Sequence, residues 1–343
     1  MRSVEWIWQW RIARGALNLL AGLPDMGKGL LWSDIVARVS KGEDWPAGEG
    51  KAPLGNIIIF TAEDNSETTV VPRLAAAGAD LDRIEIVEMA RNPDDTERMF
   101  NLATDLPALK AKIEEIGNVV LVIIDPVSAY LGVGKVSSGS STDVRGVLSP
   151  LTKLAEEKRV AILAVAHFNK KSDVTNAVLR VSDSLAWVAA SRSTYIALEE
   201  PGNEGAYLFV RAKNNLAPAN VTALRYMIGV RKVGHDPDIK QAINAPHVLW
   251  DNDPVKITAA EAMEAAARGS RSDEMKEAMD FLQSRLVLGP ILETEIKEEA
   301  RAHDISSGTL KRAKKKLKIT SVKEKGKTNG KWSWKLPTHT RGE

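Results

Sequence analysis

The chain contains no cysteine, so it can form neither a disulfide bond nor a zinc site with cysteine ligands. It also lacks any run of about 18 apolar residues, the length that a membrane-spanning helix needs. The first residues, Met-Arg-Ser-Val-Glu-Trp, do not contain the apolar core of a signal peptide. No internal repeat is evident. These absences predict a globular, cytoplasmic protein without a membrane partner.

The charge of the chain is small in total but unevenly placed. The 343 residues carry a net charge of +2, and 44% of them are hydrophobic, which allows a sizeable core. Residues 305–335 contain eleven Lys and Arg and one acid, which gives +10 and leaves −8 for the rest. This asymmetry indicates a nucleic-acid contact near the C-terminus. A solvated, lysine-rich tail is the competing interpretation.

The most informative motif is Gly22-Leu-Pro-Asp-Met-Gly-Lys28, which fits the phosphate-binding pattern G-x-x-x-x-G-K. An apolar run at 16–21 precedes it, and a helix-like run at 30–39 follows. This context predicts that backbone N–H groups and a helix N-terminus face a phosphate. The lysine would add a point charge over the β- and γ-phosphates of a nucleotide.

One position of this loop departs from the motif. The residue after the lysine is normally Ser or Thr, whose hydroxyl ligates Mg²⁺, but here it is glycine. The loop therefore predicts an ATP site with one irregular metal contact, and the alternative is a glycine-rich turn with an exposed lysine. The candidate nucleotide-binding residues of the loop are Gly22, Leu23, Pro24, Asp25, Met26, Gly27, Lys28, Gly29 and Leu30.

Apolar runs alternate with helical stretches from residue 16 to about residue 250, which predicts an α/β fold with a parallel sheet covered on both faces. The predicted strands lie at 56–62, 84–88, 119–125, 160–168, 194–198, 206–211 and 223–228. The predicted helices lie at 30–40, 67–77, 106–116, 141–157 and 182–190. Turns rich in Pro, Gly and Asn separate the last strands and predict an antiparallel extension. Residues 132–141 show no apolar periodicity, so a mobile loop is expected there.

Acidic residues end two of the predicted strands. Asp125, followed by proline, ends the apolar run at 119–125 and matches a Walker B carboxylate that holds the hydration shell of Mg²⁺. Glu63 and Asp64 follow another strand. ATP hydrolysis needs a base or positioning group for the attacking water, and Glu63 is the candidate, with Asp64 as its helper. The alternatives are a strand-ending turn for Asp125 and helix capping for the other two acids.

A further strand end carries His167, followed by Phe-Asn-Lys, and Arg73 lies ten residues after Glu63. A histidine in this place can sense a γ-phosphate, although such residues are more often structural. The order of phosphate loop, Glu-Asp, arginine, Ile-Asp-Pro and His-Phe-Asn-Lys resembles the RecA-like ATPases. More narrowly, it resembles the plasmid RepA-type hexameric replicative helicases and related phage and mobile-element AAA family ATPases. The resemblance covers about residues 12–230.

The resemblance implies a RecA-like core with a mostly parallel sheet, ATP hydrolysis with Mg²⁺, hexameric rings and single-stranded DNA in the ring channel. It implies catalytic roles for Glu63, Asp125 and His167, with Asp125 also as the metal contact. It further implies nucleotide contacts for Asp64 and Arg73.

Arg211 and Lys213 resemble the basic element with which related helicases reach the γ-phosphate of a neighbouring subunit. The resemblance therefore implies that both act across a subunit interface. The usual arginine of this pair is a lysine here, and lysine lacks the planar fork of a guanidinium. Solvent exposure at a strand end is the alternative for both residues.

The pattern changes after residue 255. Residues 259–268 are alanine-rich and helix-prone, and Gly269-Ser-Arg-Ser is expected to break that helix. The order of elements that follows is that of a winged helix, whose third helix enters the DNA major groove. The predicted elements are helices at 275–286, 292–303 and 309–317 and strands at 320–325 and 331–336, joined by an Asn-Gly turn. The predicted domains are the ATPase at 1–255, a linker at 256–272 and the winged helix at 273–338.

The third of these helices is strongly basic. Leu310 and Leu317 are expected to face the core, as are Trp332 and Trp334 on one face of the last strand. Basic side chains are expected to spread around the outward face of the helix and to contact the phosphates of duplex DNA. The candidate DNA-binding residues are Lys311, Arg312, Lys314, Lys315, Lys316 and Lys318.

These patterns favour an ATP-dependent, ring-forming DNA motor of a mobile element, with ATP and Mg²⁺ as cofactors. It would hold single-stranded DNA in the channel of a homo-hexamer and duplex DNA at the winged helix. One alternative is a nucleotide-switched DNA-binding or loading protein that does not translocate, which Gly29 and the short chain support. Another is a transcriptional regulator whose ATPase core only mediates assembly.

Overall fold

The computed structural model describes residues 1, 3–91, 96–132, 140–168, 186–236, 238–323 and 331–337. The chain divides into two compact units, Met1–Glu264 and Ala265–Glu343. Several predicted features lie wholly or partly outside the described residues: the loop at 132–141, the Asn and Lys of the motif that begins at His167, the start of the helix at 182–190, the end of the strand at 320–325, and the hairpin turn at 326–330.

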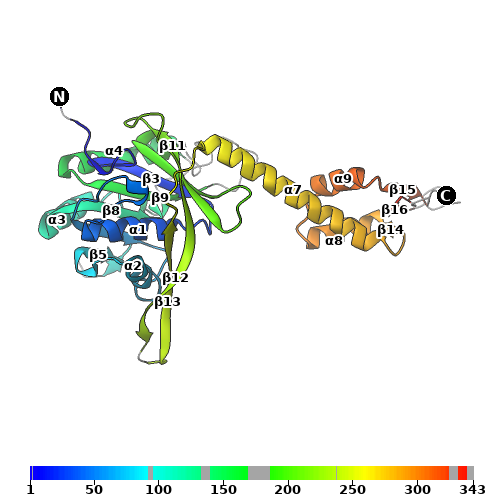
Figure 1. Cartoon of the computed structure of the whole chain (residues 1–343), viewed down its shortest axis with the longest axis horizontal. Coiled ribbons are helices and arrows are strands. Elements are labelled where there is room, and N and C mark those ends of the chain that lie inside the picture. Colours follow the sequence, from blue (N-terminus) through cyan, green and yellow to red (C-terminus); the bar gives the residue numbers. More distant parts are fainter. Residues whose placement is uncertain are drawn as a thin grey trace. The chain divides into compact units, whose positions relative to one another are not determined.

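The first unit is built on a sheet that has nine strands within the described residues, in the order β13-β12-β11-β10-β3-β9-β8-β4-β5 (Figure 1). The pairing is parallel from β10 through β3, β9, β8 and β4 to β5, and antiparallel from β10 to β13. The predicted parallel sheet and its antiparallel extension are thus confirmed. The strands are β3 (Ala16–Gly22), β4 (Asn56–Thr61), β5 (Ile84–Val87), β8 (Val119–Asp125), β9 (Ala161–His167), β10 (Ser193–Glu199), β11 (Ala206–Asn214), β12 (Leu224–Asp236) and β13 (Gln241–Trp250).

Helices cover both faces of this sheet, as predicted. Leu31 and Leu74 pack with Leu20 on one face, whereas Leu148 packs with Leu19 on the other. Neighbouring residues of β3 therefore enter different cores, because successive side chains of a strand point to opposite faces. The first face carries α1 (Lys28–Lys41) and α2 (Val71–Ala77), and the second carries α3 (Leu106–Ile116), α4 (Ser141–Lys158) and α6 (Ala186–Ala190).

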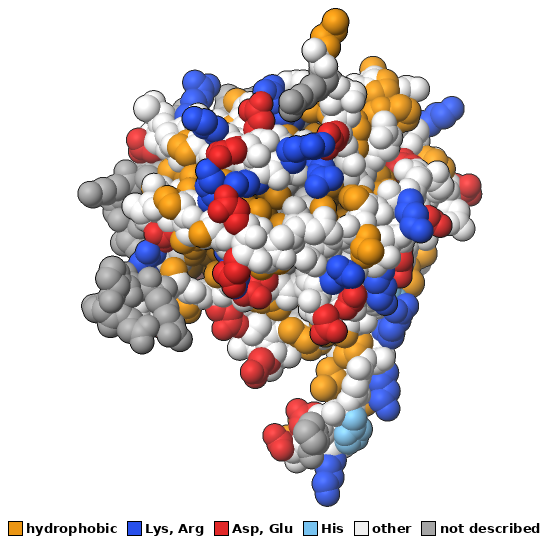
Figure 2. Space-filling view, turned by 90° about the vertical axis from the view of Figure 1, so that its left-hand side faces the viewer, with side chains coloured by type: hydrophobic (Ala, Val, Ile, Leu, Met, Phe, Trp, Pro, Cys, Tyr) orange, Lys and Arg blue, Asp and Glu red, His pale blue; other side chains and the backbone are white. Residues whose placement is uncertain are grey.

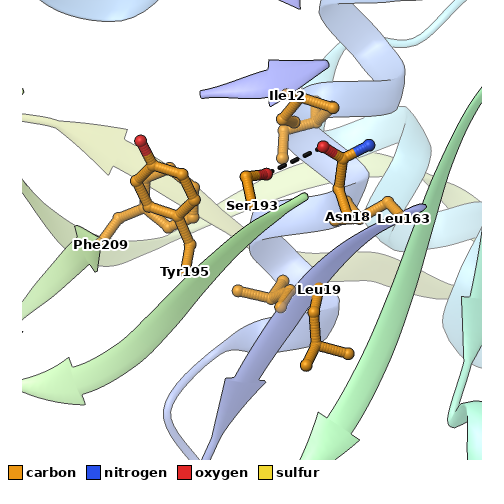
Figure 3. A pocket seen from close by; sticks show the side chains of 9 residues that line it. Ile12, Asn18, Leu19, Leu163, Ser193, Tyr195 and Phe209 are labelled. Atoms are coloured by element: carbon orange, nitrogen blue, oxygen red, sulfur yellow. Dashed lines mark hydrogen bonds between the residues drawn. The ribbon is translucent and has the colours of Figure 1, made fainter. Parts of the chain in front are cut away.

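Buried polar groups join the N-terminal strands β1 (Trp6–Trp8) and β2 (Ile12–Ala13) to the sheet. The Asn18 side chain exchanges two hydrogen bonds of 2.9 Å with the backbone of Ala13, and the Ser193 hydroxyl donates to its Oδ1 at 2.8 Å (Figure 3). The cavity beside them has a volume of about 10 Å³, room for about one water molecule. This network is therefore structural and leaves no space for a ligand.

The hairpin formed by β12 and β13 is longer than predicted. The strand prediction ended at residue 228, whereas β12 continues to Asp236 and pairs with β13 along most of its length. Figure 1 shows the hairpin reaching beyond the other strands of the sheet. The sequence gives little sign of it because its outer part is mostly exposed, so apolar residues do not mark one face.

The second unit contains a small three-stranded antiparallel sheet, in the order β14-β16-β15, together with helices. Leu310 is buried and Leu317 packs against the same core, as predicted. Trp334 is also buried, but Trp332 is 49% exposed, so its core prediction was wrong. A strand face is buried only where other elements cover it, and Trp332 lies two cross-strand pairs away from Trp334, opposite Lys323. The elements are β14 (Ile291–Leu292), α8 (Glu293–Ala302), α9 (Ser307–Lys316), β15 (Thr320–Lys323) and β16 (Trp332–Lys335).

One continuous helix, α7 (Ala259–Leu286), occupies the region where a helix break and a linker were predicted. The prediction of a break at Gly269 was therefore wrong. Glycine and serine cost at most about 1 kcal/mol each in a helix interior, and the flanking Ala, Glu and Lys residues favour helix. Even this long helix is too polar to cross a membrane, and no other helix of the described residues qualifies.

Candidate functional site

The phosphate loop lies between the end of β3 and the start of α1. Gly22 ends β3 against β10, where an added Cβ would approach the carbonyl oxygen of Ala197 to 2.5 Å, so only glycine fits. Gly27 precedes α1 with φ 67°, in the left-handed region that favours glycine. The helix begins at Lys28, so its first N–H groups border the loop. The predicted context of strand, loop and helix is thus confirmed.

The Lys28 side chain lies inside the loop. It is 7% exposed, and its Nζ donates to the carbonyl oxygens of Gly22 at 3.2 Å and Leu23 at 2.7 Å. Burial lowers the pKa of Lys28, against the attraction of nearby carboxylates, of which Asp125 is the strongest. The alternative of a glycine-rich turn with an exposed lysine is therefore wrong.

Three further strand ends meet the loop at one edge of the sheet. Their carboxyl ends lie together because the strands run parallel: His167 pairs in register with Gly22, and Asp125 with Thr61. A cleft of about 450 Å³ opens there, a size that suits a small-molecule ligand. It is lined by Pro24, Asp25, Gly27, Lys28, Gly29, Leu30, Glu63, Asp64, Arg73, Asp125, His167, Ile228 and Pro246. Most residues predicted for the nucleotide site therefore share one cleft, while Gly22, Leu23 and Met26 support it from the loop.

Asp125 has a partner that was not predicted. Trp32, one helical turn after Lys28, donates from its Nε1 to Oδ2 of Asp125 at 2.7 Å. Burial raises the pKa of the Asp125 carboxyl, and the Trp32 hydrogen bond and the Lys28 charge oppose that rise. One of the two carboxylate oxygens is thus already engaged within the protein.

Glu63 and His167 lie close together in the cleft. The distance from Oε2 of Glu63 to Nε2 of His167 is 3.6 Å, a contact between two strand ends that the sequence does not reveal. The Glu63 side chain is 62% exposed, so water reaches it freely. This combination suits a group that positions or deprotonates a water molecule.

Asp64 and Arg73 form an ion pair beside the phosphate loop. Nη1 of Arg73, on α2, donates to Oδ2 of Asp64 at 2.6 Å. Both residues were predicted as nucleotide contacts, and both line the cleft. The pair fixes a guanidinium next to Gly29, whose missing side chain leaves the space for it.

Arg211 and Lys213 lie on β11 and do not line the cleft. Nζ of Lys213 donates to the carbonyl oxygens of Val188 at 2.6 Å and Ser191 at 2.8 Å, and burial lowers its pKa. Arg211 donates to the carbonyl oxygen of Pro218 at 2.6 Å. A contact with a neighbouring subunit's nucleotide stays a prediction, and it would require these bonds to be exchanged.

The hairpin of β12 and β13 completes the cleft with residues that were not predicted. Ile228 and Pro246 line it, and the Tyr226 hydroxyl donates to the carbonyl oxygen of Met26 at 2.6 Å. A Cβ added at Gly27 would lie 3.4 Å from Cδ1 of Ile228, so the hairpin packs directly on the loop. The cleft therefore has a charged side at the strand ends and an apolar side at the hairpin.

The candidate DNA-binding residues, which lie on α9 or, in the case of Lys318, just after it, fall into two groups. Lys314 is not on an outward face: its Nζ donates to the Ser321 hydroxyl at 2.5 Å and lies 4.1 Å from the ring centroid of Trp334. Burial lowers its pKa, and the prediction was wrong because Lys314 shares the helix face of buried Leu310, four residues earlier. The exposed residues are Lys311, Arg312, Lys315, Lys316 and Lys318.

A phosphate loop at the head of α1, acids that follow β4 and end β8, and a mostly parallel sheet between two helical layers fit an AAA-type ATPase with a RecA-like core. The family model described as AAA domain (AAA_25) matches residues 1–173, just over half of the chain. The chain therefore belongs to this AAA domain family.

Among solved structures, a KaiC-like protein from the hyperthermophilic archaeon Pyrococcus horikoshii OT3 is similar to this chain, with 15% sequence identity and a TM-score of 0.47. The match covers 69% of this chain and 91% of that one. No curated protein matches the chain.

ATPases of this class bind their nucleotide together with Mg²⁺, but the donor groups of this cleft fit that ion poorly. Gly29 offers no hydroxyl, and one oxygen of Asp125 already accepts from Trp32. Within the described ranges, no cluster of three acidic or histidine side chains could hold a metal ion. The predicted metal contact would thus depend on the remaining oxygen of Asp125 and on water.

Replacing Ile228 by alanine is expected to weaken ATP binding about tenfold without affecting tripolyphosphate, because this apolar side of the cleft would hold the base and not the phosphates. Ile228 is 37% exposed, so a bound base could cover its methyl groups, and losing that contact corresponds to about that change. Calorimetry with both ligands measures it. Ile239→Ala is the matched control, since Ile239 is exposed elsewhere on the hairpin. If the two variants bind ATP with equal affinity, the base of the nucleotide does not contact Ile228.

Proposed function

We propose that this chain is the ATP-driven helicase of a plasmid, phage or other mobile element, working as a ring around single-stranded DNA. The cleft is the observation that carries the proposal, because it gathers Lys28, Glu63, Asp125 and His167 at one edge of the sheet. A nucleoside triphosphate fits this arrangement: its phosphates would meet the loop and the lysine, and its γ-phosphate would face the acids.

Each side chain has a distinct task in the proposed reaction. Nζ of Lys28 exchanges its carbonyl partners for phosphate oxygens and stabilises the negative charge on them. Glu63 holds the attacking water and accepts its proton. His167 lies 3.6 Å from Glu63. When the γ-phosphate departs, Glu63 would change its partner, and His167 is close enough to be affected. The histidine would thereby pass the state of the nucleotide to the residues that follow β9.

The proposal is tested by ATP turnover with and without single-stranded DNA, together with strand displacement on a forked duplex. A helicase turns over ATP faster when single-stranded DNA is present and separates the fork. DNA affinity that depends on the nucleotide, without strand displacement, would instead support a loader or switch. An absence of ATP turnover under all these conditions would contradict the motor.

A nucleotide-switched DNA-binding or loading ATPase is the second candidate. The irregular Gly29 favours it, as do the bonds that hold Arg211 and Lys213 to carbonyl groups of their own chain. In a hexameric motor these two cations would be released on assembly to reach the neighbouring nucleotide. Sedimentation with a non-hydrolysable ATP analogue tests the ring, and a monomer at every concentration would contradict it.

The second unit is proposed to be a winged-helix domain that binds duplex DNA. The end of α7 is followed by β14, α8, α9, β15 and β16, which is the element order of that fold, and α9 takes the place of its recognition helix. The exposed basic residues of α9 are suitable for phosphate contacts. By contrast, acidic and basic side chains are interspersed on the face of the protein seen in Figure 2.

Replacing Lys315 and Lys316 by glutamine is expected to reduce the slope of log affinity against log salt for a short DNA duplex by about two units. Each lost phosphate contact removes about one released counterion. Fluorescence anisotropy across a salt series measures the slope, and Lys41→Gln combined with Lys51→Gln in the first unit is the control. If the slope is unchanged in a correctly folded variant, Lys315 and Lys316 form a solvated face and do not contact DNA phosphates.

A further inference from the structure

The space beside Gly29 is already filled by a cation. A Cβ added at this position would lie 3.1 Å from Nη1 of Arg73 and 3.9 Å from Nε1 of Trp32. The first distance is shorter than an ordinary van der Waals contact. The side chain that usually supplies the Mg²⁺-ligating hydroxyl would therefore fit only if the Arg73 guanidinium shifted by a few tenths of an ångström.

Both N–H groups next to Gly29 are directed to carboxylates. Arg73 donates to Asp64 at 2.6 Å, and Trp32 donates to Asp125 at 2.7 Å. Asp64 thereby anchors the guanidinium at the phosphate loop, and Trp32 takes up an oxygen that a metal ion would otherwise use. A guanidinium carries five N–H donors, so the bond to Asp64 leaves others for phosphate oxygens.

We infer that the Arg73 guanidinium replaces part of the charge that Mg²⁺ supplies, and that Gly29 is the residue that makes room for it. Together with Lys28, it gives the cleft two side-chain cations that could contact the phosphates of a bound nucleotide. Binding of a nucleoside triphosphate therefore depends only weakly on a divalent cation. This inference rests on the proposed function, because it requires that the cleft bind ATP.

The test is the affinity for a non-hydrolysable ATP analogue, measured by calorimetry in excess Mg²⁺ and in excess EDTA. The wild-type protein is expected to lose less than about tenfold in affinity when Mg²⁺ is removed. Arg73→Ala is expected to weaken binding in EDTA by about 10- to 100-fold, the range for a charged hydrogen bond. In Mg²⁺ the same variant should lose less, because the ion then screens the phosphates.

The Gly29→Ser substitution is a second way to test the contact between residue 29 and the Arg73 guanidinium. The added Cβ would shift the Arg73 guanidinium by a few tenths of an ångström, so the ATP affinity of this variant should fall more steeply than that of the wild type when Mg²⁺ is removed. The two substitutions should not be additive, because both act on the same contact of Arg73. In EDTA, the double variant Gly29→Ser with Arg73→Ala should therefore bind about as strongly as whichever single variant has the lower affinity. Arg83→Ala is the control, because Arg83 pairs with Asp80 outside the cleft.

The outcomes separate this inference from the proposed function. If the wild-type protein binds the analogue in Mg²⁺ but loses it in EDTA, ATP binding stands and the role of Arg73 is refuted. If it binds the analogue in neither condition, the ATP site itself is refuted. If Gly29→Ser binds equally in both conditions, like the wild type, the glycine does not make room for the arginine and the inference fails.

Discussion

Replacing Lys28 by alanine is expected to abolish ATP binding at ordinary nucleotide concentrations. Its Nζ lies between the carbonyl groups of Gly22 and Leu23, inside the loop where the β- and γ-phosphates would be held. An ammonium group that contacts phosphate oxygens in a partly dehydrated site forms strong, charge-assisted hydrogen bonds. A loss of at least about 100-fold in affinity corresponds to roughly 3 kcal/mol, and calorimetry with ATP measures it.

This substitution should not unfold the protein, which makes the result easy to interpret. Burial lowers the pKa of Lys28, so the folded protein holds the charged ammonium less favourably than the unfolded chain does. For a basic group with a lowered pKa, this cost to folding is present at neutral pH and disappears only as the pH rises past the unfolded-state pKa. Removing the ammonium should therefore leave Tm at pH 7 unchanged or higher.

Lys41→Ala is the matched control, because Lys41 is exposed in the last turn of the same helix. It should bind ATP as the wild type does. If Lys28→Ala and Lys41→Ala bind with the same affinity, the loop is not the phosphate site, whatever the fold around it.

The central sheet and the charged side of the cleft could be predicted from the sequence because both depend on local patterns. Buried parallel strands are continuous apolar runs, so the places where they end are visible, and Asp125 and His167 stand at two of those ends. Parallel pairing then brings these ends to one edge without further information. The order of the motifs along the chain was sufficient to place Glu63 and Lys28 in the same cleft.

The apolar side of the cleft could not be predicted because it depends on packing between the hairpin and the phosphate loop, which lie far apart in the sequence. Ile228 and Pro246 enter the cleft through a long hairpin whose outer residues are mostly exposed. Nor does the sequence show that Trp32 bonds to Asp125 or that Arg73 fills the space beside Gly29. The departure of Gly29 from its motif was evident, but the guanidinium beside it became visible only in three dimensions.

Side chains with several possible partners were the least predictable. Lys314 belongs to a basic helix and was predicted to contact DNA. It packs on Trp334 instead, because its face of the helix is turned to the core. Lys213 has the position of a trans-acting cation, yet it binds carbonyl groups at the end of α6. Sequence identifies a charge and its spacing, whereas the partner of a long side chain is decided by the nearest acceptor in the folded chain.

Replacing Glu63 by glutamine is expected to stop ATP turnover while ATP binding is kept. The amide has the shape of the carboxylate and can still orient a water molecule, but it cannot accept the proton of that water. General-base catalysis contributes about 10²- to 10⁴-fold, so turnover should fall by that factor. Phosphate release measures turnover, and calorimetry measures ATP affinity on the same preparation. Glu67→Gln is the matched control, because Glu67 is exposed and does not line the cleft.

Three of the four acids of the cleft, those that follow β4 and end β8, can then be told apart by their surroundings. Asp125 is bonded to Trp32 and burial raises its pKa, while Asp64 is paired with Arg73, so neither is as accessible to water as Glu63. Asp64→Asn should release Arg73 and weaken nucleotide binding, whereas Glu63→Gln should leave binding unchanged. Near-native turnover in Glu63→Gln would move the role of base to another group, and a loss of binding would show that this glutamate holds the nucleotide and does not activate water.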